Sequence, residues 1–396
     1  MKIVHIHSFH EAAEIFNNIG VDPYGIKAMA PKAQHLNILL SSQSCQIANI
    51  LKQEMLSLGA DAAVTRGSVS CSVNATDVLL MGTLKQLSAL AEKIEKQPFG
   101  LAQIAKEIRE LLDNSAKNCH VLKTSRREIA LGARTLIMGI LNVTPDSFSD
   151  GDIYFDRKKA IEHGLQMAEE GADMIDIGGE SVRPGSKPVS ISEEIDRVVP
   201  IIEGLSRKIA IPISVDTKKP VVAQKSLAAG AEIVNDVSAL GDEMMAGVVK
   251  KANAALILMH MRGVPENMQT GNLVYDDLIG EIIQYLACRC RKAVTAGIGR
   301  EQIVADPGIG FGKTYEDNCR IINKIGEFKS LGLPILIGAS RKSFIGHVTG
   351  GQPAERIEGT AAAVSAAIMN GCHIVRVHDV AVMKKVAAMT DAIAHA

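Results

Sequence analysis

The chain has 396 residues, of which 47% are hydrophobic, so it can bury a large core but is too long for one ordinary domain unless part of it forms a barrel of about 250 residues. Lysine and arginine together number 43 against 44 aspartates and glutamates, for a formal net charge of -1, and aromatic residues make up only 3%, with no Trp. This composition argues against a nucleic-acid partner and against binding to a membrane surface.

The chain begins with MKIVHIHSFH, which lacks the apolar core and the small-residue cleavage site of a signal peptide. No uninterrupted apolar run approaches the roughly 18 residues that a transmembrane helix needs. The seven cysteines include no C-x-x-C pair, which is typical of reduced thiols in a cytosolic protein of this size. We therefore expect a soluble cytoplasmic protein that does not contact a membrane.

Short apolar runs alternate with helical stretches over about the first 120 residues. Strands are predicted for MKIVHIH, HLNILLSS, GADAAVTRGSVS and TDVLLMGT, and helices near residues 10–18, 43–57 and 83–113. The pattern predicts a small α/β or α+β domain over residues 1–118, and its role cannot be inferred from these residues.

Three histidines near the start of the chain raise the question of a metal site. His5 and His7 would share one face of a strand, with His10 close by. No acidic or Cys partner lies near them, so ordinary surface or packed histidines are the favoured interpretation and metal ligands the alternative.

From about residue 120 onward, helical stretches that end at a Gly are followed by β-branched runs with polar residues at their far ends. A Gly suits the left-handed position after a helix, and a continuous apolar run suits a parallel strand buried on both faces. After a hairpin over residues 120–134, strands are expected to start near residues 136, 174, 211, 233, 255, 303, 334 and 374. Eight βα units predict an α/β fold, a (β/α)8 TIM barrel over residues 119–396, and a doubly wound open sheet is the alternative.

Polar residues stand at the carboxyl ends of all eight predicted strands, the face on which barrels of this kind carry their active sites. They are Asn142, Glu180 with Arg183, Asp216, Asn235, His260 with Arg262, Asp306, Ser340 with Arg341 and Lys342, and Arg376 with His378. Unrelated surface loops would carry such residues at some ends and not at all eight, so we expect an active site there.

One of these loops has a sequence close to a nucleotide-binding motif. PGIGFGKT (307–314) approaches the phosphate-binding pattern G-x-x-x-x-G-K-T, but Pro307 stands where the first Gly belongs. The alternating glycines fit a close approach of backbone to a flat ligand instead. A nucleoside triphosphate site is therefore not favoured, and GADMIDIGGES lacks the spacing of a dinucleotide site.

The strand-end motifs together resemble dihydropteroate synthase, a family of pterin-binding TIM-barrel enzymes. They are GILNVTPDSFSDG (139–151), GADMIDIGGESVRPG (171–185), ISVDTKKP (213–220), IVNDVS (233–238), LMHMRGVP (258–265), DPGIGFGK (306–313), IGASRKSFIG (337–346) and RVHDV (376–380). The resemblance runs from about residue 121 to 390 with the motifs in order, and residues 1–120 fall outside it. It implies condensation of 6-hydroxymethyl-7,8-dihydropterin diphosphate with p-aminobenzoate to 7,8-dihydropteroate and pyrophosphate, in folate biosynthesis.

The resemblance also implies a pterin site, made of Asp216, Asn235, Asp306, Phe311, Gly338 and Lys342. A buried carboxylate such as Asp306 can accept two N–H groups from the edge of the flat ring, and Lys342 can donate to a ring acceptor. Asp216 is the candidate for stabilising the cation that forms as pyrophosphate leaves, and Lys342 and Arg376 are the other catalytic candidates.

For the diphosphate, the resemblance implies Asn142, Arg183, Arg376 and His378, with a Mg²⁺ cofactor held through Asn142. The rest of the segment NVTPDSFSDG (142–151) is then expected to be a flap over the site.

The p-aminobenzoate site is implied to comprise Arg183, Pro184, Ser340 and Lys342, and sulfonamides are possible inhibitors there. Val182 stands where the family commonly has Thr, and Asp152 stands where a second Gly is frequent. These departures bear on the second substrate and on sulfonamides, and not on the pterin.

Two other functions remain open at this point. A methyltransferase acting on methyltetrahydrofolate and a corrinoid protein would use the same pterin residues but would have no use for a diphosphate site around Arg376 and His378. A non-catalytic pterin-binding protein, with residues 1–120 as an interaction module, is the second. The family also suggests a homodimer.

Overall fold

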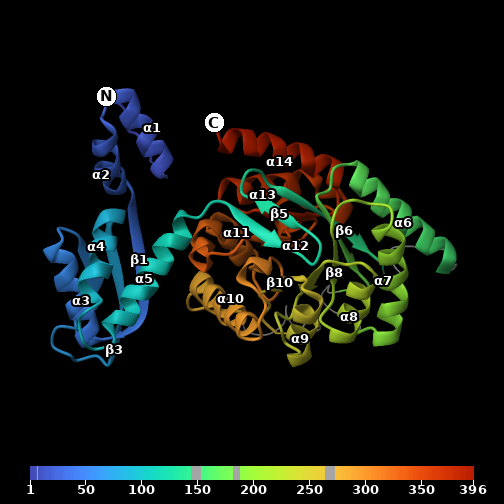
Figure 1. Ribbon diagram of the computed structural model, residues 1–396, viewed down its shortest axis with the longest axis horizontal. Helices are drawn as coiled ribbons and strands as arrows, with labels where there is room; N and C mark the ends of the chain where they lie inside the picture. The colour runs from blue at the N-terminus through green and yellow to red at the C-terminus, as the bar shows by residue number, and fades with distance from the viewer. Residues whose placement is uncertain (7, 144–152, 182–187, 264–272) are drawn as a thin grey trace. The chain divides into compact units, whose positions relative to one another are not determined.

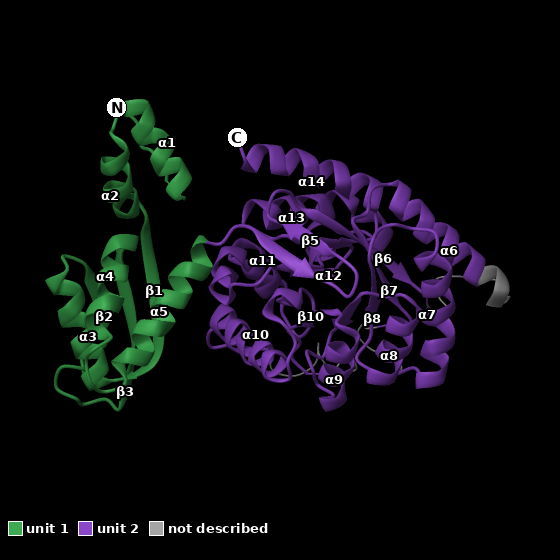
Figure 2. Cartoon of the chain, in the orientation of Figure 1, with its two compact units in different colours: residues 1–116 green, residues 117–396 purple. Residues whose placement is uncertain are grey.

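The computed structural model describes residues 1–6, 8–143, 153–181, 188–263 and 273–396. The chain divides into two compact units, Met1–Ala116 and Lys117–Ala396, which Figure 2 distinguishes by colour. Each unit has a hydrophobic core of its own. Among the described residues, no helix has the length and hydrophobicity needed to cross a membrane.

The first unit is an α+β domain with a three-stranded antiparallel sheet in the order β1-β3-β2. Its elements are α1 (Phe9–Ile19), α2 (Pro23–Ala33), β1 (His35–Ser44), α3 (Cys45–Ser57), β2 (Asp61–Val64), β3 (Ala75–Thr83), α4 (Leu84–Ile94) and α5 (Leu101–Ala116). Alternate residues of β3 are buried, as expected for a sheet with one face covered. Helices α3 and α4 pack against this sheet and bury Leu51, Met55, Leu87 and Leu90.

Two sequence predictions for this unit were wrong. Residues 1–6 form no strand, since no described strand pairs with them and Ile3 is exposed, and alternation alone does not make a strand without a partner. The single helix expected over residues 83–113 is two helices, α4 and α5. Pro98 and Gly100, the latter at φ +81°, lie in the break between them, where a helix cannot continue.

The second unit is an eight-stranded parallel barrel, and Figure 1 shows its helices surrounding the strands. The strands are β6 (Leu136–Asn142), β7 (Met174–Gly178), β8 (Ile213–Asp216), β9 (Ile233–Asp236), β10 (Ala255–Met259), β11 (Ile303–Asp306), β12 (Leu336–Ile337) and β13 (Ile374–Val377). The helices are α6 (Ile153–Glu169), α7 (Ile191–Ser206), α8 (Pro220–Ala229), α9 (Glu243–Ala252), α10 (Leu278–Thr295), α11 (Tyr315–Asn323), α12 (Ser343–Thr349), α13 (Ile357–Met369) and α14 (Val380–Ala394), with 3-10 turns at Arg300–Gln302, Ile325–Leu331 and Pro353–Glu355.

The barrel closes between β11 and β12, through a parallel bridge from Ala305 to Ile335. This closure confirms the TIM barrel and excludes the open sheet that the sequence left as an alternative. Gly171, Gly230 and Gly371 have φ values of +94°, +120° and +96° just before β7, β9 and β13, which confirms their predicted left-handed role after a helix.

A hairpin of β4 (His120–Lys123) and β5 (Glu128–Leu131) covers the amino-terminal end of the barrel. Leu122 and Leu131 from this hairpin join the interior side chains of the barrel strands in one buried cluster. The amino-terminal end is therefore sealed with apolar side chains, and the polar strand ends lie at the opposite, carboxyl-terminal end.

Candidate active site

The register of the first four barrel strands places their polar carboxyl-terminal residues in neighbouring positions. Asn142 pairs with Gly178, Gly178 with Asp216, and Asp216 with Asn235. A Cβ at Gly178 would lie 3.5 Å from Cβ of Asp216 and 3.8 Å from Oδ1 of Asn142. Gly178 therefore leaves space between these two side chains at the mouth of the barrel.

Arg376 of β13 joins two carboxylates across the barrel mouth. Its Nε donates to Oδ2 of Asp176 at 2.6 Å, and its Nη2 donates to Oδ2 of Asp216 at 2.7 Å. Asp176 is fully buried, and Asp216 is nearly so. The predicted diphosphate ligand Arg376 and the predicted cation-stabilising Asp216 are thus directly bonded to each other.

Asp176 is not among the residues predicted from the strand ends. It lies in the middle of β7, with its side chain facing the barrel interior, and Nδ2 of Asn235 also donates to its Oδ2 at 3.0 Å. A carboxylate inside an otherwise apolar strand is seldom fully buried without a charged partner, and that signal in MIDIG could have identified it.

Two acceptor atoms in this cluster are buried without a hydrogen-bond partner among the described residues: Oδ1 of Asp176 and Oδ1 of Asn235. A buried acceptor without a donor costs about 1–3 kcal/mol, so such atoms mark a place suited to a ligand with N–H groups.

The pKa of Asp216 depends on the burial of its carboxylate and on the charges of neighbouring side chains. Burial raises the pKa of Asp216 above its ordinary value, although Arg376 opposes that rise. The charges of Asp176 and Glu194 raise this pKa further. The mouth therefore favours a positive charge close to Asp216, because such a charge would relieve the repulsion among the carboxylates.

Asp306 is the last residue of β11, and its carboxylate is buried at the mouth like those of Asp176 and Asp216. Its Oδ1 accepts a hydrogen bond from the amide of Gly308 at 2.7 Å, and burial raises its pKa to about 6. Lys342 places its ammonium 4.0 Å from the centre of the Phe311 ring, a cation–π contact. Phe311 belongs to an apolar cluster with Val237 and Met259, so the carboxylate and the ammonium border an apolar surface.

The glycines of PGIGFGKT approach the protein's own atoms. A Cβ on Gly308 would lie 1.9 Å from the carbonyl oxygen of His260, and one on Gly310 would lie 3.2 Å from Cδ of Lys342. These glycines lie close to the backbone after β10 and to the Lys342 side chain. The sequence had predicted that they allow a flat ligand to approach the backbone.

Lys313 of the same segment points inward and is only 2% exposed. It donates to the carbonyl of Phe311 at 3.0 Å and lies 2.9 Å from Nδ1 of His260, and burial lowers its pKa to about 7. A lysine held in this way supports the loop from beneath and is not placed to bind a nucleotide phosphate, in agreement with the sequence interpretation. The Lys313–His260 pair was not anticipated.

Two strand ends meet at Ser340 and His378. Oγ of Ser340 lies 3.0 Å from Nδ1 of His378 and accepts a hydrogen bond from its amide at 3.2 Å. A Cβ on Gly338 would lie 3.9 Å from Cβ of Arg376. The structure thus gathers these predicted residues around the last two strands of the barrel.

Some predicted site residues lie outside the described part of the chain. They are Arg183 and Pro184, the departures Val182 and Asp152, and the flap beyond Val143. His7 lies outside it as well, so the histidine metal site stays a hypothesis that the described residues do not test. Among the described residues, no group of three His, Cys, Asp or Glu side chains could hold a metal ion.

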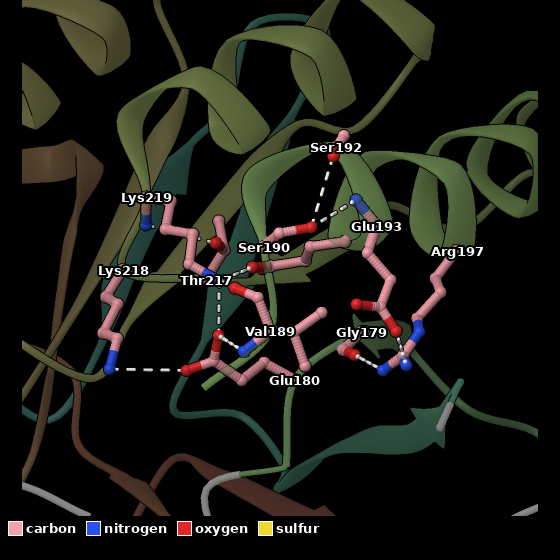
Figure 3. Close-up of polar contacts among 11 residues, drawn as sticks. Gly179, Glu180, Val189, Ser190, Ser192, Glu193, Arg197, Thr217, Lys218 and Lys219 are labelled. Atoms are coloured by element: carbon pink, nitrogen blue, oxygen red, sulfur yellow. Dashed lines mark hydrogen bonds and ion pairs between the residues drawn. The ribbon is translucent and has the colours of Figure 1, made fainter. Parts of the chain in front are cut away.

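Glu180, the predicted polar residue after β7, is paired with lysines that follow β8. Nζ of Lys219 donates to the carboxylate of Glu180, and Lys218 lies 3.3 Å from its other oxygen. Lys219 also lies 2.5 Å from Oε2 of Glu194 in α7, whose side chain is 1% exposed. Figure 3 shows the polar contacts around Glu180. Glu180 is therefore held by ion pairs with two lysines.

Several known proteins are similar to the barrel unit of this chain. The model of the pterin-binding enzyme family matches residues 138–378. The dihydropteroate synthase of Bacillus subtilis is 46% identical over 273 residues, which cover 69% of this chain and 93% of that protein. The crystal structure of Yersinia pestis dihydropteroate synthase with a sulfonamide drug is 39% identical and superimposes with a TM-score of 0.66, over 70% of this chain and 100% of that one.

A longer match includes the first unit. A probable bifunctional folylpolyglutamate synthase/dihydropteroate synthase of Halobacterium salinarum is 40% identical over 376 residues, or 95% of this chain, and the chain spans only 45% of that relative's length. This match therefore includes residues of both units.

Proposed function

The chain belongs to the dihydropteroate synthase family of pterin-binding enzymes, and on this premise we propose which of its residues carry the reaction. The activity is a transferase reaction in folate biosynthesis, in which 6-hydroxymethyl-7,8-dihydropterin diphosphate and p-aminobenzoate form 7,8-dihydropteroate and pyrophosphate. The observation that carries our assignment of roles is the group of buried carboxylates around Arg376, with unpartnered acceptor atoms on Asp176 and Asn235.

The pterin binds at the floor of the barrel mouth in this proposal. Its edge carries several N–H groups, which match the carboxylate of Asp306 and the unpartnered oxygens of Asp176 and Asn235. Its flat ring suits the apolar surface around Phe311, and Lys342 donates to a ring acceptor. Gly338 supports this arrangement because it adds no side chain beside Arg376.

The carboxylates then act during cleavage of the carbon–oxygen bond to pyrophosphate. Asp216 and Asp306 are buried carboxylates at the mouth, and their negative charge favours positive charge developing on the dihydropterin. Asp216 is our candidate for stabilising that cation. Pyrophosphate departs with the electron pair of the carbon–oxygen bond, the amine of p-aminobenzoate then attacks the methylene carbon of the cation, and the proton that the nitrogen loses passes to solvent.

The departing diphosphate needs positive charge and hydrogen-bond donors at the rim. Arg376 has guanidinium hydrogens beyond those donated to Asp176 and Asp216, and His378 lies beside it at the end of β13. We assign both to the diphosphate, together with Arg183.

A Mg²⁺ ion would fit this site as a companion of the diphosphate. Asn142 offers one amide oxygen at the mouth, and Mg²⁺ commonly takes one or two protein oxygens, substrate phosphate oxygens and water. The ion would neutralise charge on the leaving group, and Asn142 would orient it.

We assign the p-aminobenzoate to the rim formed by Ser340, Lys342, Arg183 and Pro184. Ser340 lies at the end of the barrel beside His378, and Lys342 reaches from the same loop toward Phe311. The Yersinia pestis relative has been crystallised with a sulfonamide drug. We propose that sulfonamides compete with p-aminobenzoate in this chain.

One assay tests the proposed function. The chain is incubated with dihydropterin diphosphate, p-aminobenzoate and Mg²⁺, and the release of pyrophosphate is followed with and without p-aminobenzoate. We expect release that depends on the amine and is strongly reduced in Asp306→Asn. Pterin binding without release would favour a non-catalytic binding protein, and methyl transfer from methyltetrahydrofolate to a corrinoid would favour the methyltransferase.

A further inference from the structure

Two cysteines from separate segments of the first unit lie next to each other. Cys45 is the first residue of α3 and is only 5% exposed, whereas Cys71 lies in the loop between β2 and β3 and is exposed. The Cys71 thiol is close enough to form a hydrogen bond with that of Cys45. Sγ of Cys45 also donates to the carbonyl of Val73, two residues after Cys71, at 3.0 Å. A thiol that solvent reaches therefore borders a buried one.

Contacts from one face of α3 hold the loop around Cys71. Asn49 lies four residues after Cys45, on the same face of the helix. Its Nδ2 donates to the carbonyl of Ser68 at 3.0 Å, and Oγ of Ser68 donates to Oδ1 of Asn49 at 3.1 Å. Ser68 and Val73 are thus both bonded to this face. Cys71 lies between them in the sequence, so the loop holds it beside Cys45.

The loop is also folded by hydrogen bonds of its own backbone. The amide of Cys71 donates to the carbonyl of Ser68 at 3.2 Å, and that of Ser72 donates to the carbonyl of Gly67 at 3.1 Å. Cys71 has φ +50°, a left-handed conformation that is uncommon for a residue with a Cβ. The Cys71 thiol is therefore carried by a backbone that its neighbours fix in an uncommon conformation.

The two thiols differ in a way that suits oxidation in two steps. Burial raises the pKa of Cys45, and the charge and hydrogen bond of Cys71 raise it further. Cys71 is exposed, so it is the thiol that an external reagent meets first. Once the Cys71 sulfur is bonded to another sulfur it carries no thiolate charge, and that contribution to the pKa of Cys45 is removed. The amino-terminal end of α3 also favours a thiolate at Cys45.

We propose that Cys45 and Cys71 are a reversible disulfide site, in which exchange with a low-molecular-weight disulfide joins their sulfur atoms. This inference goes beyond the proposed function and does not rest on it. In the first step the Cys71 thiolate attacks one sulfur of the external disulfide, and one external thiol leaves with the proton that Cys71 lost. In the second step the Cys45 thiolate attacks the Cys71 sulfur, and the other external thiol leaves with the proton of Cys45. The chain loses two electrons and two protons, and the external disulfide is reduced to two thiols.

The new bond closes the segment of chain that holds α3, β2 and the loop after it. A cross-link of this kind reduces the conformational freedom of the unfolded chain and thereby stabilises the folded one. Oxidation therefore makes the first unit more resistant to unfolding, and reduction reverses the effect.

The test exposes the full-length protein to oxidised glutathione, blocks the remaining thiols and analyses the tryptic peptides by mass spectrometry. Trypsin cleaves after Lys52 and Arg66, between the two cysteines, so a Cys45–Cys71 disulfide joins two peptides that are otherwise separate. We expect joined peptides after oxidation and separate peptides after treatment with reduced glutathione. Hydrogen exchange in α3 should slow by about tenfold or more in the oxidised protein, because the cross-linked unit opens less readily.

Three variants separate the steps and provide the control. In Cys45→Ser, whose hydroxyl can still donate to the carbonyl of Val73, the mixed disulfide of Cys71 with glutathione should accumulate because the second thiol is missing. In Cys71→Ser, the buried Cys45 should react with glutathione at least about tenfold more slowly than Cys71 does. Cys288→Ser removes an exposed thiol of α10 and should leave the Cys45–Cys71 disulfide unchanged.

The proposal is overturned if Cys71 does not react with oxidised glutathione, or if its mixed disulfide persists in the unsubstituted protein. Disulfides that join two chains on a non-reducing gel, in place of the internal one, would overturn it as well. Exchange in α3 that is unchanged or faster after oxidation would show that the bond does not fit the folded unit. Release of pyrophosphate enters none of these readouts, so failure of the proposed function is detected separately.

Discussion

Arg376 is held between Asp176 and Asp216, and this pairing determines what the residue can contribute to the reaction. Its guanidinium is preorganised by two carboxylates that are themselves buried, so its remaining hydrogens point in defined directions. A preorganised donor needs no rearrangement as charge develops on the leaving group. The same pairing holds two carboxylates side by side at the mouth, which benefits a developing cation.

We predict that Arg376→Met lowers the rate of pyrophosphate release by on the order of 10²–10³, the usual effect of losing one such donor. The variant should also be less stable by about 3–5 kcal/mol, because Asp176 and Asp216 lose their shared counter-charge. Single-turnover kinetics and denaturant unfolding measure the two effects. Adding Asp176→Asn should restore stability but not the rate, and recovery of both would show that Arg376 has only a structural part.

Asp306 gives a prediction about pH. Its pKa is raised to about 6 by burial, so in the free protein it is a carboxylate near neutral pH and becomes protonated as the pH falls through about 6. Protonation removes an acceptor that the pterin N–H groups need. The Kd of a pterin without diphosphate should therefore rise by up to about tenfold per pH unit below that value.

Asp306→Asn provides the control for this pH dependence. The amide turns one donor toward a donor of the pterin, at a cost of about 2–3 kcal/mol of binding free energy. Calorimetry across the pH range should show a weak affinity without the step near pH 6. A step that persists in the variant would assign the titration to a different group.

At the scale of elements, the loop after β11 illustrates how a segment without regular structure supports a site. Gly308 packs against the backbone after β10, and Lys313 is tied from beneath to His260 and to the carbonyl of Phe311. Phe311 is thereby fixed below Lys342. The loop is held in place by these contacts to neighbouring strand ends of the barrel.

Gly310→Ala tests this loop. Gly310 has φ +83°, which is strained for Ala, and the added Cβ would press on the Lys342 side chain from 3.2 Å. We expect a loss of about 1–2 kcal/mol of stability and a weaker affinity for the pterin. Gly247→Ala in α9 is the control, since nothing lies within 4 Å of its added Cβ. It should stabilise the protein by about 0.5–1 kcal/mol, and pterin binding should stay unchanged.

At the scale of the whole molecule, the two units have separate hydrophobic cores. The core of residues 1–116 is built from its own sheet and helices, and that of residues 117–396 from the barrel, its helices and the hairpin. Units with complete cores of their own are able to fold alone. The match to the Halobacterium salinarum relative includes residues of both units. We nevertheless expect the barrel to fold without the first core, because its own core is complete.

A chain of residues 117–396 is therefore expected to be soluble and to bind dihydropterin diphosphate with the affinity of the full chain. Circular dichroism melting and calorimetry would check both properties. A chain starting at Thr135 should instead aggregate or melt at a lower temperature, because it lacks Leu122 and Leu131 at the bottom of the barrel. If the longer fragment also fails to fold, the barrel depends on the first unit.

The amino-acid sequence by itself determined the barrel and the strand ends at which we place the site. Continuous apolar runs between helices and polar residues at every strand end placed β6 to β13, and Asn235, Asp306 and Lys342 followed from those ends. These features are local, because a strand buried on both faces and the Gly before it are written into a few consecutive residues.

Only the tertiary structure decided which charged groups meet. Arg376 and Asp176 are 200 positions apart, and they touch because β13 lies beside β6 and β6 beside β7 in the closed barrel. The same holds for Lys219 with Glu180 and Glu194, and for Lys313 with His260. Strand patterns specify which face of a strand is buried, but barrel closure and register set the partner of each buried charge. Burial then makes that pairing obligatory, since a charge without a partner is too costly inside a protein.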